Sequence, residues 1–186
     1  MSESTEPKPM PDMLSPEERV ARTIRVDQAG EYGAVRIYQG QRAVLGKAGA
    51  SAKALAEMEA AERQHLATFN ALMVERRVRP TALSPLWHIA GFALGAGTAL
   101  LGEKAAMACT VAVEDVIEEH YARQAEALKA SGETKLVGEI ERARAGELEH
   151  RDTALAAGAK DAPGYEALTA VVKAGSKLAI WLSERI

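Results

Sequence analysis

Apolar residues recur every three or four positions along most of the chain, which is the period of an α-helix. The stretch from residue 51 carries the clearest stripe, which includes Leu55, Leu66 and Leu72. Prolines, glycines and short polar turns separate one such stretch from the next. The pattern predicts six helices, over about residues 15–46, 51–77, 83–102, 105–130, 134–157 and 165–184.

The start of the first helix carries a strong local signal. Ser15 suits the N-cap, Pro16 suits the first helical position, and Glu18 suits the reciprocal partner in a capping box. The preceding residues are polar and contain three of the seven prolines. They lack the apolar core of a secretory signal and the arginines of a mitochondrial transit peptide. We therefore expect a disordered leader over residues 1–14 and one folded domain over 15–186, in a cytoplasmic protein of a bacterium.

Residues 83–102 form a segment without formal charge, in which His88 is the one ionisable residue. The segment is about as long as a membrane-spanning helix needs to be. However, its four glycines weaken it as an isolated helix, and no basic flank orients a span. Two interpretations are left: a buried connecting helix, or an apolar helix that dips into one side of a membrane with the help of Trp87.

Composition narrows the class of protein. Charged residues make up 26% of the 186 residues and aromatic residues only 4%, which favours helices over a sheet. The net charge of −3 argues against a nucleic-acid-binding protein. Cys109 is the only cysteine, so the chain can form neither an internal disulfide nor a cysteine-based zinc site.

Two of the four histidines follow a glutamate by three residues, in the pairs Glu62–His65 and Glu147–His150. On a helix, residues three apart lie on the same face, so each pair can offer an oxygen and a nitrogen to one metal ion. By itself this spacing is a weak signal, because glutamate is common in this chain.

Two further glutamates make the pattern more specific. Glu31 lies 31 residues before Glu62, and Glu114 lies 33 residues before Glu147. With a rise of about 1.5 Å per residue, a helical hairpin of this length brings its second glutamate back to a similar height as the first. The chain therefore contains the same arrangement twice: a lone glutamate, then a Glu-x-x-His pair one hairpin later.

These glutamates and histidines interrupt apolar stripes, where a carboxylate is costly unless it is paired or bound to metal. Four carboxylates would balance two divalent ions, and two neutral imidazoles would complete the ligands. Such oxygen- and nitrogen-rich sites suit iron or manganese, and di-iron carboxylate bundles use this ligand set. Solvated surface glutamates would explain any one residue but not the matched set. The predicted ligands are Glu31, Glu62, His65, Glu114, Glu147 and His150.

Other polar residues near the predicted ligands are expected to lie outside the metal site. Glu118 is the uncertain one, since it lies one turn from Glu114. Asp27 lies one turn before Glu31, where it could orient a ligand histidine. His88, which lacks a preceding glutamate, is expected to be a packing or interfacial residue.

Several segments resemble the demethoxyubiquinone hydroxylase family, and the resemblance covers nearly the whole chain after about residue 17. The region 79–113 is more specific for this family than any Glu-x-x-His pair. The segments are RVDQAGEYGAVRIYQGQ, ERQHL, RPTALSPLWHIAGFALGAGTALLG, ACTVAVEDVIEEHY, GELEHRDTAL and the C-terminal IWLSERI.

This resemblance implies an all-α fold: a ferritin-like four-helix bundle with two additional helices, one of them apolar and membrane-facing. It implies that the same six residues bind two ferrous ions in a ferritin-like di-iron domain over residues 15–186. It also implies hydroxylation of the ring of a demethoxyubiquinol with O2 in ubiquinone biosynthesis, with NADH as the source of electrons. His120 and Tyr121 match a family pair near the irons that is linked to electron or proton transfer.

The resemblance further implies peripheral attachment to the cytoplasmic side of a bacterial cell membrane. The expected partners are the demethoxyubiquinol and O2, together with further copies of the chain or a complex of ubiquinone-biosynthesis proteins. Eukaryotic members have a lipid-binding partner protein. No nucleic acid is expected.

Three rival functions differ in testable ways. Another ferritin-like di-metal oxidase or peroxidase would use similar ligands, although the four-cysteine site of a rubrerythrin is absent from the sequence. A non-catalytic iron-binding bundle would gain nothing from an exposed apolar segment, which promotes aggregation. A helical membrane-interaction module with surface glutamates would bind no iron.

Overall fold

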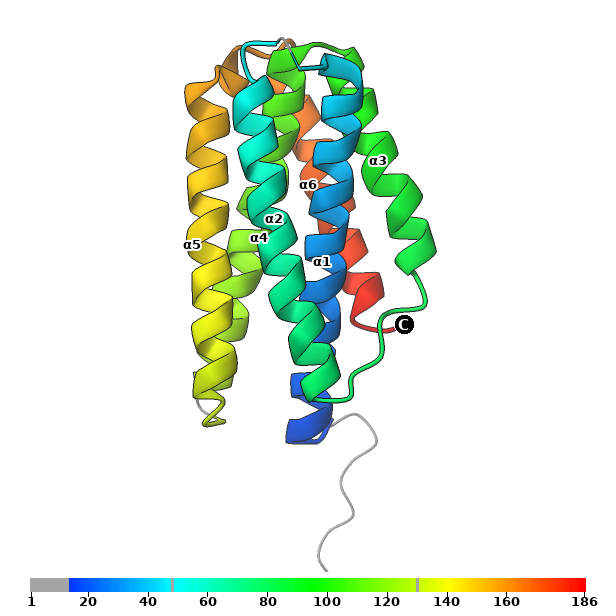
Figure 1. The fold of residues 1–186 in the computed structure, drawn as a ribbon, viewed down its shortest axis with the longest axis vertical. Coiled ribbons are helices and arrows are strands. Elements are labelled where there is room, and N and C mark those ends of the chain that lie inside the picture. The colour runs from blue at the N-terminus through cyan, green and yellow to red at the C-terminus, as the bar shows by residue number, and fades with distance from the viewer. Residues whose placement is uncertain (1–13, 48, 130) are drawn as a thin grey trace, which may run out of the picture.

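The computed structural model describes residues 14–47, 49–129 and 131–186. These residues form a bundle of six α-helices, with a short 3-10 helix at Ala159–Asp161 (Figure 1). The six predicted helices are confirmed. The predicted leader, apart from Leu14, lies outside the described residues. The α-helices are α1 (Pro16–Leu45), α2 (Ala52–Glu75), α3 (Ser84–Leu100), α4 (Glu103–Lys129), α5 (Thr134–Ala156) and α6 (Tyr165–Ser183).

Helices α1, α2, α5 and α4 form a ring in which each helix packs against the next. Two helical hairpins, α1–α2 and α4–α5, supply this ring (Figure 1). Helix α3 packs on the outside of α1, and α6 packs on the outside of α4. The arrangement confirms the predicted all-α, ferritin-like bundle of four helices with two additional helices.

The N-terminus of α1 has the capping box that the sequence predicts. The hydroxyl of Ser15 accepts a hydrogen bond from the backbone N–H of Glu18 at 3.1 Å. The carboxylate of Glu18 in turn accepts one from the backbone N–H of Ser15 at 2.8 Å. Two of the N–H groups that a helix start leaves without partners are thereby satisfied.

Two clusters of buried apolar residues fill the ring at different heights. On α1, Ile24 belongs to one cluster and Tyr38 to the other, and the predicted ligand of that helix lies between them. On α2 the corresponding residues are Phe69 and Met58. On α4 and α5 as well, residues of the two clusters lie on either side of the predicted ligands. The core is therefore apolar above and below one layer that carries the predicted ligands.

Helix α3 approaches α1 very closely because glycines line their contact. A Cβ atom added at Gly95 would lie 1.9 Å from the carbonyl oxygen of Ile37, and one added at Gly40 would lie 2.2 Å from that of Phe92. The sequence presented the glycines of α3 only as a weakness of the isolated helix. The structure gives them a positive role, because only glycine permits two backbones to come this close.

The outward face of α3 is apolar and exposed. Ile89 is 67% exposed and Leu100 is 75% exposed, while Gly95, Thr98 and Ala99 are the buried residues of the helix. The interpretation of residues 83–102 as a buried connecting helix is therefore wrong for this face. Among the described residues, no helix is both long enough and apolar enough to span a membrane.

Replacing Gly95 with alanine is expected to destabilise the protein by about 3 kcal/mol, because the new methyl group collides with the backbone of α1. Thermal or denaturant unfolding measures the effect. Gly97→Ala is the matched control on the same helix, since a Cβ there meets nothing within 4 Å. The control should stabilise the protein by up to about 1 kcal/mol, because alanine favours the helix more than glycine does. Equal behaviour of the two variants would refute the close packing of α3 on α1.

Candidate metal centre

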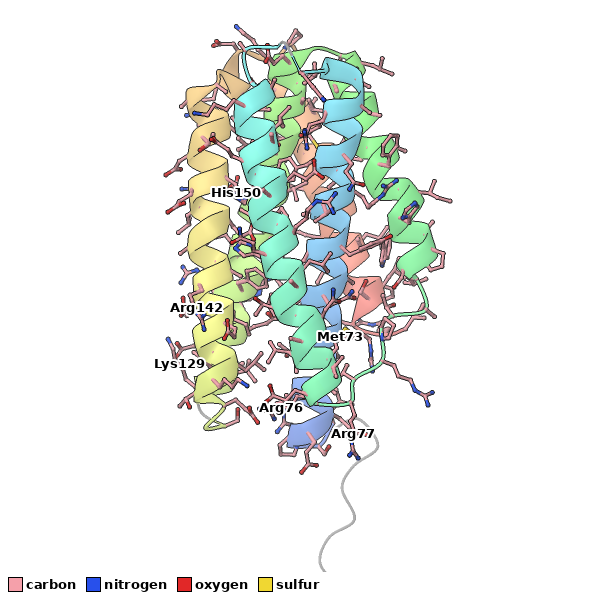
Figure 2. The ribbon with its side chains drawn as sticks, in the orientation of Figure 1. Met73, Arg76, Arg77, Lys129, Arg142 and His150 are labelled. Atoms are coloured by element: carbon pink, nitrogen blue, oxygen red, sulfur yellow. The ribbon has the colours of Figure 1, made fainter. Side chains whose placement is uncertain are left out.

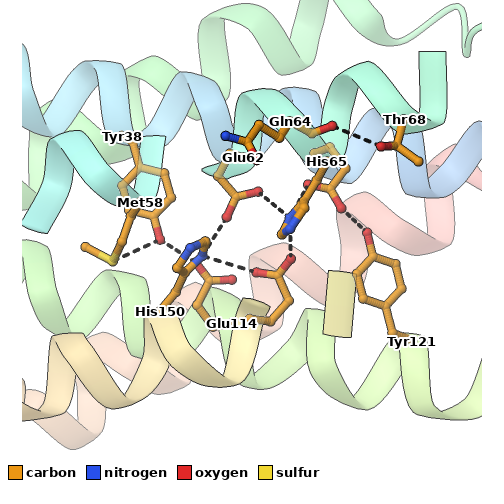
Figure 3. A network of polar contacts seen from close by, with 11 residues as sticks. Tyr38, Met58, Glu62, Gln64, His65, Thr68, Glu114, Tyr121 and His150 are labelled. Carbon is orange, nitrogen blue, oxygen red and sulfur yellow. Dashed lines mark hydrogen bonds and ion pairs between the residues drawn. The ribbon is translucent and has the colours of Figure 1, made fainter. Parts of the chain in front are cut away.

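The structure brings all six predicted ligands together inside the ring (Figure 3). They form two groups of four, and within each group one possible ligand atom per residue lies within 4.8 Å of the others. The first group is Glu31, Glu62, His65 and Glu147, and the second is Glu62, Glu114, Glu147 and His150. Glu62 and Glu147 belong to both groups, so the arrangement offers two adjacent ion positions that share two carboxylates.

Each helix of the ring contributes to this cluster from its inner face. The lone glutamates come from α1 and α4, and the Glu-x-x-His pairs come from α2 and α5. Figure 2 shows His150 on α5, where it is buried, whereas Arg142 and Lys129 are exposed. The spacing of three within each pair thus directs both side chains inward, as expected from helix geometry.

The cluster contains polar atoms whose hydrogen-bonding capacity is not used. Both carboxylate oxygens of Glu62 and of Glu147 are buried without a well-oriented hydrogen bond, as is the Nδ1 atom of His150. These groups do approach one another as ion pairs, for example at 2.8 Å between His150 Nδ1 and Glu62 Oε1. Buried polar atoms normally have partners, and a set of unpartnered oxygens and nitrogens that converge is the donor set of a metal site.

Electrostatics in the cluster favour either bound protons or bound cations. Burial raises the pKa of Glu31 well above its usual range, and the neighbouring carboxylate of Glu62 raises it further. For His65, burial lowers the pKa, but contacts with Glu147 and Glu31 outweigh it and raise the pKa to about 12. Without an ion, the cluster therefore holds protons that a divalent cation must displace.

Tyr121 contacts the cluster directly, because its hydroxyl donates a hydrogen bond to Glu31. His120 belongs to neither ligand group; its Nε2 atom lies 3.6 Å from Asp27 Oδ1. The structure pairs Asp27 with His120 on α4, so the expectation that Asp27 orients a ligand histidine is wrong. The reason is that the face of α1 that carries Asp27 meets α4, whereas the predicted ligand histidines lie on α2 and α5. The role of His120 and Tyr121 in electron or proton transfer stays a prediction.

Sequence reasoning missed Tyr38 as part of the cluster. Its buried hydroxyl donates a hydrogen bond of 2.6 Å to Glu114. A signal was present in the sequence, since Tyr38 follows Glu31 by seven residues just as Tyr121 follows Glu114.

Two other polar residues that the sequence analysis considered lie outside the cluster. Glu118 accepts a hydrogen bond of 2.8 Å from Arg144. The exposed side chain of His88 on α3 contacts α1, with Nδ1 2.5 Å from the hydroxyl of Tyr32.

Comparison with known families decides the affiliation of the chain. The family model described as ubiquinone biosynthesis protein COQ7 matches residues 18–183, which include the whole cluster. The chain belongs to the COQ7 family. The resemblance to demethoxyubiquinone hydroxylases is thereby confirmed.

Curated COQ7-family relatives match over most of the chain. A 3-demethoxyubiquinol 3-hydroxylase of Rhodospirillum rubrum is 56% identical over 177 residues, which cover 95% of this chain and 83% of that protein. The human protein, named NADPH-dependent 3-demethoxyubiquinone 3-hydroxylase, mitochondrial, is 52% identical over 170 residues, or 90% of this chain and 78% of that protein. The 5-demethoxyubiquinone hydroxylase of Saccharomyces cerevisiae is 44% identical over 180 residues, or 89% of this chain and 77% of that protein.

Two cavities lie close to the cluster of this COQ7-family chain. An apolar groove of about 290 Å³ runs between α1, α3, α4 and α6, and Gly30 on α1 and Val113 on α4 line it. These two residues are the sequence neighbours of the predicted ligands Glu31 and Glu114, so the groove runs along the outer side of the helices that carry them. A second cavity, of about 630 Å³, reaches His120 and is lined by basic side chains, including Arg19, Arg22, Arg123 and Lys177.

Gly146 on α5 leaves the space that the His65 ring occupies. A Cβ atom added there would lie 2.6 Å from Cε1 of His65. Gly146→Ala is therefore expected to displace this ring and weaken metal binding at the His65 group by about tenfold or more. Gly138→Ala is the control on the same helix, since its Cβ would meet nothing within 4 Å. Anaerobic titration with Fe2+ compares the metal affinities of the two variants. Equal affinities would show that Gly146 is not needed to make room for the His65 ring.

Proposed function

We propose that the chain is a di-iron demethoxyubiquinol hydroxylase, which uses O2 to add a hydroxyl group to the quinol ring in ubiquinone biosynthesis. The observation that carries this proposal is the cluster of four carboxylates and two histidines, all buried except the partly exposed His65, in a chain 56% identical to a 3-demethoxyubiquinol 3-hydroxylase. A storage bundle or a membrane module would have no use for an apolar groove beside such a cluster.

The donor set of the cluster fits a pair of divalent ions. Four carboxylates match the charge of two such ions, and the unpartnered oxygens of Glu62 and Glu147 face both ion positions. When bound, a pair of ferrous ions supplies the electrons and the Lewis acidity that the reduction of O2 requires. The chain fixes the six side chains on rigid helices, and the apolar clusters on either side keep water away from them.

The apolar groove supports an isoprenoid quinol as the substrate. A Cβ atom added at Gly30, Gly33 or Gly175 would meet nothing within 4 Å, so these glycines leave room along its walls. The groove borders α3 and α6, whose outer faces carry exposed apolar residues such as Ile89 and Trp181. A prenyl tail in this groove would stay out of water while the ring lies near the cluster.

The basic cavity beside His120 supports a reduced nicotinamide dinucleotide as the electron source. Its cationic side chains suit the phosphates of a dinucleotide, and Trp181 offers an aromatic surface at its wall. The resemblance implies NADH, whereas the human relative is named NADPH-dependent. Oxidation of the two dinucleotides by the iron-loaded protein, measured side by side with a quinone present, decides between them.

We also propose that the protein attaches peripherally to the cytoplasmic side of a bacterial cell membrane, through the exposed face of α3. Its substrate would reside in that membrane, and the groove borders α3. Further copies of the chain or other ubiquinone-biosynthesis proteins are the expected partners there.

The direct test of the reaction uses purified protein loaded anaerobically with Fe2+. Given O2, a reduced dinucleotide and a short-tailed demethoxyubiquinol, the protein should yield a quinol that has gained one oxygen atom, as detected by mass spectrometry. Protein kept free of metal is the control. Consumption of O2 or peroxide without the oxygenated quinol would favour an oxidase or a peroxidase instead, and iron uptake without either reaction would favour storage.

A further inference from the structure

Two tyrosines occupy equivalent positions in the two halves of the bundle. Tyr38 follows Glu31 on α1 by seven residues, and Tyr121 follows Glu114 on α4 by the same number. Seven residues are about two helical turns, so each tyrosine lies on the same face as the glutamate of its own helix. In Figure 3 the two tyrosines lie at opposite ends of the cluster.

Each tyrosine contacts the glutamate of the other half. Tyr38 donates a hydrogen bond of 2.6 Å to Oε1 of Glu114, and Tyr121 donates one to Oε1 of Glu31. Both tyrosines are fully buried. The two hydrogen bonds therefore cross between α1 and α4 in opposite directions, which relates the two halves of the cluster by an approximate twofold symmetry.

The two oxygens of each lone glutamate have different environments. Oε1 accepts the tyrosine hydrogen bond, whereas Oε2 of Glu31 and Oε2 of Glu114 are buried without a hydrogen-bond partner. Oε2 of Glu31 lies 3.6 Å from Nδ1 of His65, within the first ligand group. Each carboxylate is thus held by one oxygen and leaves the other oxygen available to an ion.

We propose that Tyr38 is a positioning residue of the metal centre, which orients Glu114 so that one oxygen of this carboxylate faces the ion, as Tyr121 does for Glu31. The proposal rests on the metal centre proposed above. The terminal torsion of a glutamate is broad, so without the hydroxyl the carboxylate can rotate. A buried hydrogen bond to one oxygen removes this freedom before the ion binds.

The surroundings of Tyr38 support a role in positioning alone. Its hydroxyl also lies 3.7 Å from the sulfur of Met58, and its ring meets the ring of His150 edge-on, with centroids 6.1 Å apart. Met58 belongs to the apolar cluster at this end of the core, and His150 belongs to the second ligand group. Because Glu114 belongs only to the second ligand group, the effect of Tyr38 should be confined to that group.

Titration of the metal-free protein with Co2+ tests the proposal, because Co2+ reports its ligand geometry through its visible absorption. The unmodified protein should bind two ions. In Tyr38→Phe one dissociation constant should rise about tenfold or more, and the visible spectrum of that ion should change. The other constant should stay within about twofold. Tyr32→Phe, which removes a hydroxyl that contacts His88, is the control and should match the unmodified protein.

A double-mutant cycle tests whether Tyr38 acts through Glu114. In a Glu114→Ala background, Tyr38→Phe should cause no further change in Co2+ binding or spectrum. An effect of the same size in this background would overturn the proposal. So would a Tyr38→Phe variant that binds both Co2+ ions equally more weakly, or one whose Co2+ binding is unchanged. Circular dichroism of the metal-free variants verifies that they fold. Failure of the unmodified protein to bind two ions would instead contradict the metal centre itself, so the two failures are distinguishable.

Discussion

Replacing Glu147 with alanine is expected to abolish hydroxylation and to lower the iron content from about two ions per chain to almost none. Glu147 belongs to both ligand groups, so its loss removes a carboxylate from both ion positions at once. The change also removes a negative charge that lies near both histidines, whose Nδ1 atoms are 3.6 Å (His65) and 3.7 Å (His150) from its oxygens. The remaining three carboxylates no longer match the charge of two divalent ions.

Iron analysis and turnover of a demethoxyubiquinol analogue measure this effect. Glu149→Ala is the matched control, because Glu149 lies two residues further along α5 and is exposed. It should keep both its iron and its activity. Glu114→Ala provides an intermediate case, since Glu114 belongs to one group and its loss should affect mainly one ion. If Glu147→Ala kept two irons per chain, the shared-carboxylate arrangement would be refuted.

The double variant Ile89→Glu/Leu100→Glu is expected to lower binding to phospholipid vesicles by about tenfold or more, while its iron content is unchanged. Both residues lie on the exposed face of α3, and a carboxylate there opposes insertion into the apolar part of a bilayer. Leu94 is a poorer position for this test, because it lines the apolar groove and its replacement would also disturb substrate binding.

Vesicle sedimentation at one protein concentration measures the partition of each variant. Val74→Glu is the matched control, since Val74 is 81% exposed and lies on α2, away from α3. It adds the same charge to an apolar surface position and should leave vesicle binding intact. Equal binding of the double variant and the control would exclude α3 as the membrane-binding surface.

The sequence was sufficient to predict the helices and the six side chains that converge inside the bundle. Helical spacing is a local property, so Glu62 and His65 had to share a face of α2 whatever the rest of the chain did. The turns near Gly46 and Gly132 fixed the lengths of the two hairpins, and those lengths set the heights of Glu31 and Glu114 relative to the Glu-x-x-His pairs. Repetition of the pattern in both halves then distinguished the predicted ligands from the many other glutamates.

Only the tertiary structure decided which side chains meet across helices. It paired Tyr38 with Glu114 and Asp27 with His120, and it placed α3 outside α1 with an exposed apolar face. These contacts depend on how each helix is rotated about its axis and how closely it packs, and both are set by many side chains at once. The glycines show the difference: from the sequence they only weaken an isolated helix, whereas the close approach of α3 to α1 makes Gly95 a packing requirement.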